Sequence, residues 1–243
     1  MRQSLIIIPT YNEVENIGLM IDALTAAYEH AHILVVDDNS PDGTAQLVHL
    51  RQQQQPERLF LEQRTGKLGL GTAYIHGFKW AIARDYEFVF EMDADFSHNP
   101  ADLLLLYEAC AVRGADLSIG SRYIKGVNVV NWPLSRVLLS YGASIYVRAI
   151  TGMPVKDATA GFICYKASLL RRINLDSIKF VGYAFQIELK FKAWLLNAKI
   201  IEVPVIFTDR TRGKSKMSGN IISEAVIGVL SMKFKSVLGK LEI

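Results

Sequence analysis

The sequence is poor in cysteine and has no long apolar run. Its two cysteines, Cys110 and Cys164, lie far apart and form no metal-ligand spacing, so we predict buried thiols in a reducing compartment. The most apolar helical stretches, 134–150 and 221–232, contain charged residues and are shorter than the roughly 20 residues that span a membrane. The apolar segment 5–9 is too short for a signal peptide. These absences predict a cytoplasmic protein without a transmembrane helix.

Two glycine-rich phosphate-binding motifs are also missing. Residues 9–13 read Pro-Thr-Tyr-Asn-Glu, where a dinucleotide-binding fold has G-x-G-x-x-G, and this argues against a nicotinamide or flavin oxidoreductase. Residues 66–72 read Gly-Lys-Leu-Gly-Leu-Gly-Thr and place the lysine wrongly for a P-loop, which argues against an ATPase or kinase. Glycines ahead of a helix still suit the binding of an anion.

The positive charge is concentrated near the C-terminus. The formal net charge is +3, of which residues 210–243 contribute +5 and residues 1–209 contribute −2. Such a basic segment favours phosphates or an anionic membrane surface. No helix-turn-helix, zinc-finger spacing or aromatic RNA-binding signature accompanies it, so we do not expect a nucleic-acid partner.

Short runs rich in isoleucine and valine alternate with helical patterns. The expected strands are 4–8, 32–36, 58–61, 86–92 and 116–120, and the expected helices are 12–28, 44–54, 72–83 and 100–113. This alternation is typical of βαβ units and predicts an α/β fold with a mainly parallel sheet. With 50% hydrophobic residues, helices should cover both faces of the sheet.

After residue 120 the pattern changes. Helices are expected at 132–150, 185–196 and 220–235, and a strand at 200–207. The first of these helices carries an apolar stripe, and the last is amphipathic. We expect one domain, residues 1–243, with amphipathic C-terminal helices and no internal repeat.

Asp93 and Asp95 flank a single residue where a buried strand should open into a loop. Two carboxylates at the carboxyl end of a strand suit a divalent cation that neutralises a diphosphate leaving group. The same pattern also fits a turn in which Asp95 caps the helix near Pro100, and three residues alone do not separate these interpretations.

Further acids follow the first two expected strands. Tyr11 and Glu13 could stack on a base and bind its ring nitrogens or ribose, although Glu13 also favours a helix N-terminus. Asp37 and Asp38 precede a Ser-Pro-Asp-Gly turn that explains residues 40–44 as a turn and helix cap. With Glu13, Asp93 and Asp95, Asp38 would place four carboxylates around one crevice, which requires a cation or a sugar-hydroxyl network.

Several segments together resemble the dolichyl-phosphate mannose synthases, which are inverting, metal-dependent glycosyltransferases with the GT-A fold. The resemblance rests on segments 9–13, 36–44, 67–71, 92–98, 120–123, 157–162, 185–188 and 209–216, which occur in the same order as in that family. It covers nearly the whole chain. Each motif is modest by itself, but the set is highly specific.

The resemblance implies roles for individual residues. Pro9, Tyr11, Glu13, Val36 and Asp38 match residues that hold the nucleotide of GDP-mannose. Asp93, Ala94 and Asp95 match those that meet the sugar diphosphate and its Mg²⁺ or Mn²⁺, while Arg122, Arg210 and Lys216 match phosphate-binding residues. Arg136 matches a residue placed where the lipid phosphate arrives. Ser97 stands where other members of the family carry glutamine, which could be a third metal ligand. Serine is a weaker ligand than glutamine.

The implied reaction is transfer of mannose from GDP-mannose to a polyprenyl or dolichyl phosphate with inversion. Catalysis would depend on positioning and on neutralisation of the leaving group by the metal and arginine, with Asp93, Asp95 and Arg122 as catalytic residues. Residues 1–120 would bind the nucleotide sugar, and residues 121–243 would face the acceptor and the membrane.

The acceptor implies an enzyme bound peripherally at the cytoplasmic membrane face. The helices from residues 132 and 220 offer apolar faces with basic neighbours, although the same faces would equally pack on the sheet. Many relatives add transmembrane helices, and this chain resembles the short forms, for which a small membrane-anchoring partner is a further expectation. Ala158 and Ala160 replace residues common in the family.

Other functions remain alternatives. The same fold would serve a UDP-sugar, such as UDP-glucose, as donor to the same lipid or to a glycan. A non-catalytic subunit that binds sugar nucleotide would lack acidic or phosphate-binding positions, which are all present here. A sugar-nucleotide pyrophosphorylase would carry a glycine-rich loop after the first strand, where this chain has Pro9 to Glu13.

Overall fold

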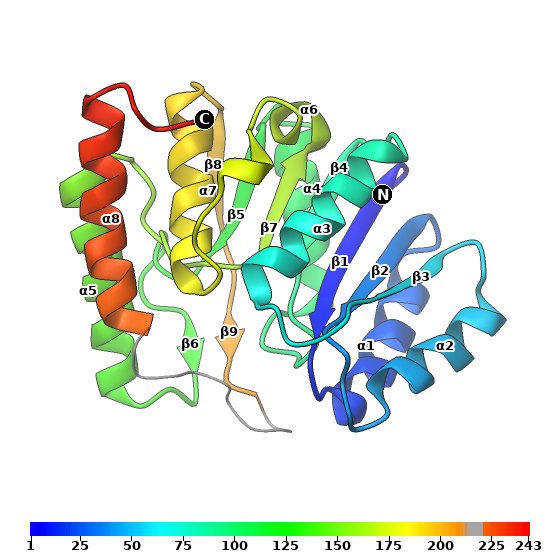
Figure 1. Ribbon diagram of the computed structural model, residues 1–243. Helices are drawn as coiled ribbons and strands as arrows, with labels where there is room; N and C mark the ends of the chain where they lie inside the picture. Colours follow the sequence, from blue (N-terminus) through cyan, green and yellow to red (C-terminus); the bar gives the residue numbers. More distant parts are fainter. Residues whose placement is uncertain (211, 213–220) are drawn as a thin grey trace.

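A mixed β-sheet flanked by helices dominates the computed structural model, which describes residues 1–210, 212 and 221–243 (Figure 1). In this part of the chain the main sheet has seven strands in the order β3-β2-β1-β4-β7-β5-β8. They are β1 (Ser4–Thr10), β2 (Ala31–Asp37), β3 (Leu59–Gln63), β4 (Phe88–Glu91), β5 (Leu117–Ser121), β7 (Ile163–Lys166) and β8 (Ile200–Pro204). A second, two-stranded sheet pairs β6 (Val129–Val130) with β9 (Phe207–Thr208).

Strand β7 is the antiparallel member of the main sheet. It lies between β4 and β5 and runs opposite to both, while the remaining neighbours are parallel. The mainly parallel α/β sheet predicted from the sequence is therefore confirmed. The sequence pattern missed β7 because four residues are too few to show a period, and we predicted no strand between 121 and 199.

The strand expected at 200–207 was wrong in its extent. Pro204 ends β8, and the chain then leaves the main sheet to form β9 in the second sheet. Proline donates no backbone hydrogen bond, so it suits the end of a strand. The expected helix at 44–54 has the observed bounds, and the other predicted helices begin and end within a few residues of the observed ones.

Helices cover both faces of the sheet. Along β1 the side chains alternate: Ile6 and Ile8 belong to one core cluster, and Leu5 and Ile7 belong to the other. The first core contains α1 (Val14–Ala27), α2 (Thr44–Gln54) and α4 (Leu103–Ala111), and the second contains α3 (Leu70–Ala83) and α7 (Tyr183–Leu195). Each large side chain that is fully buried in these cores stabilises the fold by about 1.5–3 kcal/mol.

Helices α5 (Leu134–Thr151) and α8 (Ile221–Val237) lie together at the end of the sheet remote from β3 (Figure 1). Helix α8 also packs against α7, and Gly228 allows close contact with the ring of Phe180 because a Cβ there would lie 2.6 Å from it. The shorter elements are α6 (Ala167–Leu170) and the 3₁₀ helices Pro100–Asp102 and Leu175–Ser177. Among the described residues, no helix combines the length and apolarity needed to cross a bilayer.

The apolar stripes of these two helices do not pack on the sheet. Leu134 and Leu138 of α5 are 71% and 62% exposed, and Ile227 and Phe234 of α8 are 68% and 67% exposed. The interpretation that these stripes cover the sheet is therefore wrong for these positions. Buried contacts come instead from other faces, for example Val147 of α5 and Val229 of α8.

Candidate active site

The loops that follow β1, β2, β4 and β5 meet at one edge of the sheet. These four strands run in the same direction, so their carboxyl ends lie together, where open α/β sheets bind ligands. The loops carry the motifs 9–13, 37–44, 92–98 and 121–123. The structure therefore brings most of the sequence-predicted site residues to a common edge.

Asp95 is buried, and its carboxylate forms an ion pair with Arg210. Its Oδ2 lies 2.8 Å from a guanidinium nitrogen of Arg210, and its Oδ1 accepts a hydrogen bond of 3.0 Å from the backbone of Ser97. Phe96, between them, has a φ of +60°, a left-handed conformation that is costly for a bulky residue and is found preferentially at functional sites. The tight turn holds the Asp95 carboxylate beside Arg210.

His98 supports the neighbouring Asp93. The backbone N–H of Asp93 donates to Nδ1 of His98 at 3.3 Å, and the imidazole stacks on Phe162 with 4.7 Å between ring centroids. Burial lowers the pKa of His98 to about 4, with Arg122 adding to the shift and Asp95 opposing it. The neutral ring is thus the form that accepts this hydrogen bond near pH 7.

Arg122 is held by the loop that precedes β7. Its backbone N–H and its Nε both donate to Oδ2 of Asp157, at 2.9 and 2.7 Å, and a terminal nitrogen donates to the hydroxyl of Thr159 at 2.9 Å. Asp157 is fully buried and Arg122 is 7% exposed. The pairing compensates both charges and fixes the direction of the guanidinium group.

Arg136 occupies a second basic position near the start of α5. It donates to Asp209 at 2.8 Å, and its guanidinium carbon lies 4.1 Å from the centroid of the Trp132 ring. The backbone N–H of Arg210 donates to the same oxygen of Asp209 at 3.1 Å. Asp209 therefore links the two arginines that the sequence analysis placed at phosphates.

A cavity of about 460 Å³ opens beside these residues. Asp93, His98, Arg122 and Arg136 line its polar part. Side chains of α5 and α8, among them Leu138, Leu139, Val226 and Val229, form an apolar wall. The cavity thus joins an end lined by charged side chains to an apolar surface.

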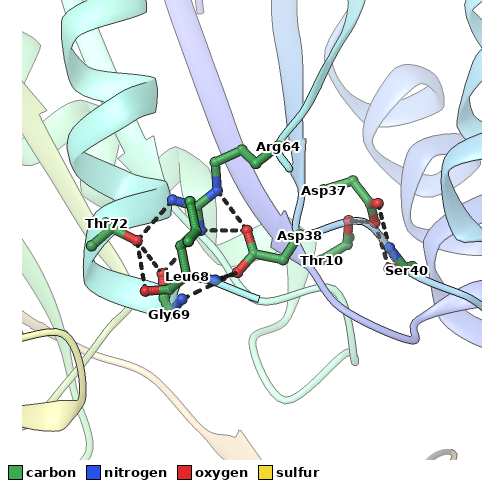
Figure 2. Close-up of polar contacts among 8 residues, drawn as sticks. All are labelled: Thr10, Asp37, Asp38, Ser40, Arg64, Leu68, Gly69 and Thr72. Carbon is green, nitrogen blue, oxygen red and sulfur yellow. Dashed lines mark hydrogen bonds and ion pairs between the residues drawn. The ribbon is translucent and has the colours of Figure 1, made fainter. Parts of the chain in front are cut away.

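Asp38 differs from our expectation of an acid that shares a crevice with three other carboxylates. Figure 2 shows that its carboxylate is bound by the chain itself: Oδ1 accepts from Arg64, and Oδ2 accepts from the backbone N–H groups of Leu68 and Gly69 at 3.0 and 3.2 Å. Arg64 also donates to Thr72 and to the carbonyl of Gly69. Asp38 thus anchors the glycine-containing loop 64–72.

Asp37 likewise has an internal role. Its carboxylate accepts hydrogen bonds from the hydroxyl of Thr10 at 2.7 Å and from the backbone and hydroxyl of Ser40 at 2.8 and 2.6 Å (Figure 2). The carboxylate of Asp42 accepts from the backbone and hydroxyl of Thr44 at 3.0 and 2.6 Å. The turn predicted for residues 40–44 is therefore confirmed, whereas the N-cap position of α2 is Gly43, which has no side chain to cap the helix.

The remaining donor-side residues lie around the end of β1. The ammonium of Lys67 is 4.7 Å from the centroid of the Tyr11 ring, which places loop 64–72 next to the aromatic residue expected to stack on a base. Glu13 precedes α1 and accepts from the side chain of Asn16 at 2.8 Å. Pro9 and Val36 pair across β1 and β2.

The expected helix cap at Asp95 is contradicted by the structure, and the expected role of Lys216 is not tested by it. The 3₁₀ helix at Pro100 is capped by the side chain of Asn99, so the interpretation of Asp95 as the cap near Pro100 was wrong. Lys216 lies outside the described residues. Ala94 is buried between the two aspartates, and Ser97 is buried beside Asp95.

Three residues that shape this edge of the sheet were not among the predicted site residues: Arg64, His98 and Asp157. Asp157 and His98 lie inside motifs that carried the family resemblance, and that position was the available signal. Arg64 gave no local signal, because its partner Asp38 is 26 residues away. Such pairs become visible only in the fold.

The arrangement suits a divalent cation. Asp93 and Asp95 offer carboxylate oxygens, and Asp95 already binds a positive group, so this position favours a cation. Within the described ranges, no set of three or more histidine, cysteine, aspartate or glutamate side chains could hold a metal ion. Mg²⁺ needs only one or two carboxylates when phosphate oxygens and water complete its shell, so the residues present fit it.

This chain is similar to known proteins in its sequence and in its fold. The model of glycosyl transferase family 2 matches residues 5–178. The chain is 47% identical over 225 residues to an undecaprenyl-phosphate mannosyltransferase of Micrococcus luteus, covering 93% of this chain and 91% of that protein. It is 45% identical over 228 residues to a polyprenol monophosphomannose synthase of Mycolicibacterium smegmatis, covering 94% and 86%.

More distant relatives extend the comparison. A dolichol-phosphate mannosyltransferase of Pyrococcus furiosus is 36% identical over 225 residues, covering 90% of this chain and 60% of that protein. Crystal structures of glucosyl-3-phosphoglycerate synthase from Mycobacterium tuberculosis share the fold. One, with phosphoglyceric acid, has a TM-score of 0.68 at 19% identity and covers 96% of this chain and 80% of that one. Another, with Mn²⁺, UDP-glucose and phosphoglyceric acid, has a TM-score of 0.66 at 20% identity and covers 96% and 79%.

A mainly parallel sheet with an Asp-x-Asp turn after β4 and arginines facing one cavity defines a glycosyltransferase of the GT-A fold. Within that class, the chain belongs to glycosyl transferase family 2.

Proposed function

We propose that this protein transfers mannose from GDP-mannose to a polyprenyl phosphate, with inversion at the sugar carbon. The observation that carries the proposal is the cavity of about 460 Å³, which joins Asp93, Arg122 and Arg136 to an apolar wall from α5 and α8. An acceptor with an anionic head and a hydrocarbon tail matches both parts. The names of the bacterial relatives support the same substrate class.

The donor would bind at the carboxyl ends of β1, β2 and β4. Tyr11 would stack on the base, with Lys67 and loop 64–72 beside it. Asp93 and Asp95 would hold Mg²⁺ or Mn²⁺, which when bound supplies positive charge against the departing diphosphate. Arg210 lies next to Asp95 and would contact the diphosphate, as would Lys216.

The acceptor phosphate needs no strong general base, because it is already anionic near neutral pH. Arg122 and Arg136 line the cavity and would orient this phosphate toward the sugar. The hydrocarbon chain would then lie along α5 and α8. In this arrangement residues 1–120 supply most of the donor site, and residues 121–243 supply most of the acceptor site.

The protein would work at an anionic membrane surface, since its acceptor remains in the bilayer. Exposed apolar side chains follow α8 at Ile227, Leu230, Phe234 and Val237. Lys235 on the same helix and Lys240 just after it add positive charge, worth about 1 kcal/mol each near anionic lipid. Apolar residues flanked by lysines are typical of helices that lie in the membrane interface.

A panel of donors tests the proposal directly. Purified protein would receive GDP-mannose, UDP-glucose or other nucleotide sugars, together with a short-chain polyprenyl phosphate in detergent. We expect lipid-linked mannose from GDP-mannose with Mg²⁺ or Mn²⁺, and loss of product with EDTA. The anomeric configuration would be read by NMR. Transfer only from a UDP-sugar, or no sugar on the lipid from any donor, would contradict the proposal.

A further inference from the structure

Lys190 is a fully buried cation that the reaction outlined above does not use. It lies in the middle of α7, and its side chain has no exposed surface. Burial lowers the pKa of Lys190 to about 8, and Glu91 and Asp157 oppose this shift. Three carbonyl oxygens lie within hydrogen-bond distance of Nζ, which matches the three donors of an ammonium group. Burying an ammonium group is costly, and an apolar side chain of similar volume often stabilises a core better.

The hydrogen bonds of Lys190 are directed at one loop. Its Nζ donates to the carbonyl oxygens of Ala160 at 2.6 Å and Ala158 at 3.1 Å, and to the carbonyl of Gln186 in its own helix at 3.3 Å. The two alanines stand on either side of Thr159. The ammonium group therefore clamps the backbone of residues 158–160.

The clamped loop is the one that holds Arg122. Asp157 accepts from the backbone and side chain of Arg122, and Thr159 accepts from its terminal nitrogen at 2.9 Å. A second anchor acts at the start of the loop, where Glu202 accepts from the backbone N–H groups of Lys156 and Asp157 at 2.8 and 2.9 Å. Thr159, Ala160 and Gly161 also line the cavity.

We propose that Lys190 is a positioning residue: it fixes loop 157–161 and, through Asp157 and Thr159, aims the guanidinium of Arg122 into the cavity. That Arg122 meets the acceptor phosphate rests on the proposed function, but the clamp itself does not. A misplacement of a catalytic group by about 1 Å lowers the rate by as much as about 100-fold, so the clamp has a measurable effect.

Lys190→Met tests the clamp, with Lys192→Met as a matched control. Lys192 is equally buried in the same helix, but it bonds to Ser177 and Glu188 and not to loop 157–161. At pH 7 we expect Lys190→Met to lower kcat by about 10- to 100-fold while the KM for the donor changes less than about threefold. Lys190→Gln, which retains one donor group, should give an intermediate kcat.

A spectroscopic measurement separates this inference from the proposed function. The Nε–H of Arg122 is bonded to buried Asp157, so its proton should exchange slowly with water in ¹⁵N spectra, and Arg122→Lys assigns the signal. Lys190→Met should speed this exchange at an unchanged melting temperature, whereas Lys192→Met should not. Slow exchange in Lys190→Met, or equal losses in both variants, would overturn the proposal whatever sugar the enzyme transfers. If Lys190→Met does not fold, Lys190→Gln is judged by the same two measurements.

Discussion

At the scale of single residues, the polar groups of the site are bound by the chain itself. Arg210 and the Ser97 backbone hold Asp95, His98 holds the backbone of Asp93, and Asp157 holds Arg122. Such internal partners fix side-chain directions before a substrate arrives, so little reorganisation is needed during the reaction. Asp93 and Asp95 would hold a divalent cation that supplies positive charge against the diphosphate, and Arg210 lies beside Asp95, where it would contact the same diphosphate.

Asp95→Asn should abolish most metal-dependent transfer and leave the fold intact. The amide oxygen can still accept from the Ser97 backbone, but the negative charge that holds a cation is lost. We expect kcat to fall by about 100- to 1,000-fold and the free energy of unfolding to change by less than about 2 kcal/mol. Transfer assays with Mn²⁺ and urea unfolding curves would measure both quantities.

Asp42→Asn serves as the control for this change. Asp42 also follows a strand at the same edge, but its carboxylate has local partners: Oδ1 accepts from the backbone and hydroxyl of Thr44, and Oδ2 accepts from the backbone N–H of Val14. Activity should stay within about twofold of the wild type, because the asparagine oxygen can still accept from Thr44 and only the bond from the Val14 N–H is lost. Undiminished transfer by Asp95→Asn would remove Asp95 from the mechanism.

At the scale of elements, loop 64–72 runs from the end of β3 into the first turn of α3, and Asp38 at the end of β2 holds it in place. Asp38 binds its two backbone N–H groups, and Arg64 binds its end at Thr72. The N–H of Gly71 donates to the carbonyl of Val181 at 2.9 Å, and a Cβ at Gly71 would lie 2.9 Å from the Phe180 carbonyl. Glycine at position 71 therefore permits the close approach of α3 to the segment before α7.

Arg64→Met should loosen this loop. The side chains of Arg64 and Asp38 are 9% and 8% exposed, so removing the guanidinium leaves a buried carboxylate with fewer partners. We expect the free energy of unfolding to fall by about 3 kcal/mol and the KM for the donor to rise about tenfold, since the loop borders the expected base site. Urea unfolding and steady-state kinetics would test this.

Arg51→Met provides the comparison. Arg51 pairs with Asp22 at the surface, where the two side chains are 34% and 45% exposed. Such a pair is worth about 0–1 kcal/mol, and it lies on α1 and α2 away from the cavity, so neither stability nor donor KM should change much. If Arg64→Met behaves like Arg51→Met, the loop does not depend on the Asp38 pair.

At the scale of the whole molecule, the proposed function places the donor and the lipid tail of the acceptor toward opposite ends of the sheet. Helices α1 and α2 lie near β3, and α5 and α8 lie at the opposite end (Figure 1). The exposed apolar side chains of α5 and α8 are at the acceptor end, next to the cavity that both helices line. This end of the molecule is where contact with a lipid surface is expected.

Replacing Ile227, Phe234 and Val237 together by serine should weaken vesicle binding. These side chains are 68%, 67% and 72% exposed, so their loss costs little stability but removes apolar surface available to the bilayer. In sedimentation with anionic vesicles at low salt, we expect the bound fraction of the variant to require about tenfold more lipid. Transfer to a short-chain acceptor in detergent should be retained.

A second variant controls for exposed apolar surface in general. Leu50 and Val112 are 58% and 78% exposed on α2 and just after α4, two helices of the core on the other face of the sheet from α5 and α8. Serine at both positions should leave vesicle binding unchanged. Wild-type protein that stays in the supernatant with anionic vesicles would contradict peripheral membrane binding.

The sequence predicted the parallel framework well because most strands are short apolar runs separated by helical segments and turn residues. Ile6 and Ile8 alternate with Leu5 and Ile7, and this pattern alone indicates a strand buried on both faces. It failed for β7, whose four residues find their place only between β4 and β5. It failed also for Asp38, whose expected role as a shared acid changed once Arg64 was beside it.

By itself, the sequence determined the α/β framework, the common edge of the sheet that carries Asp93, Asp95 and Arg122, and the membership of glycosyl transferase family 2. Those features depend on local periodicity, turn chemistry and motif order, which are properties of neighbouring residues. Only the tertiary structure decided that Arg64 neutralises Asp38, that Lys190 clamps loop 157–161, and that the stripes of α5 and α8 face outward. Burial and ion pairing depend on contacts between residues far apart in the chain, and no local pattern specifies them.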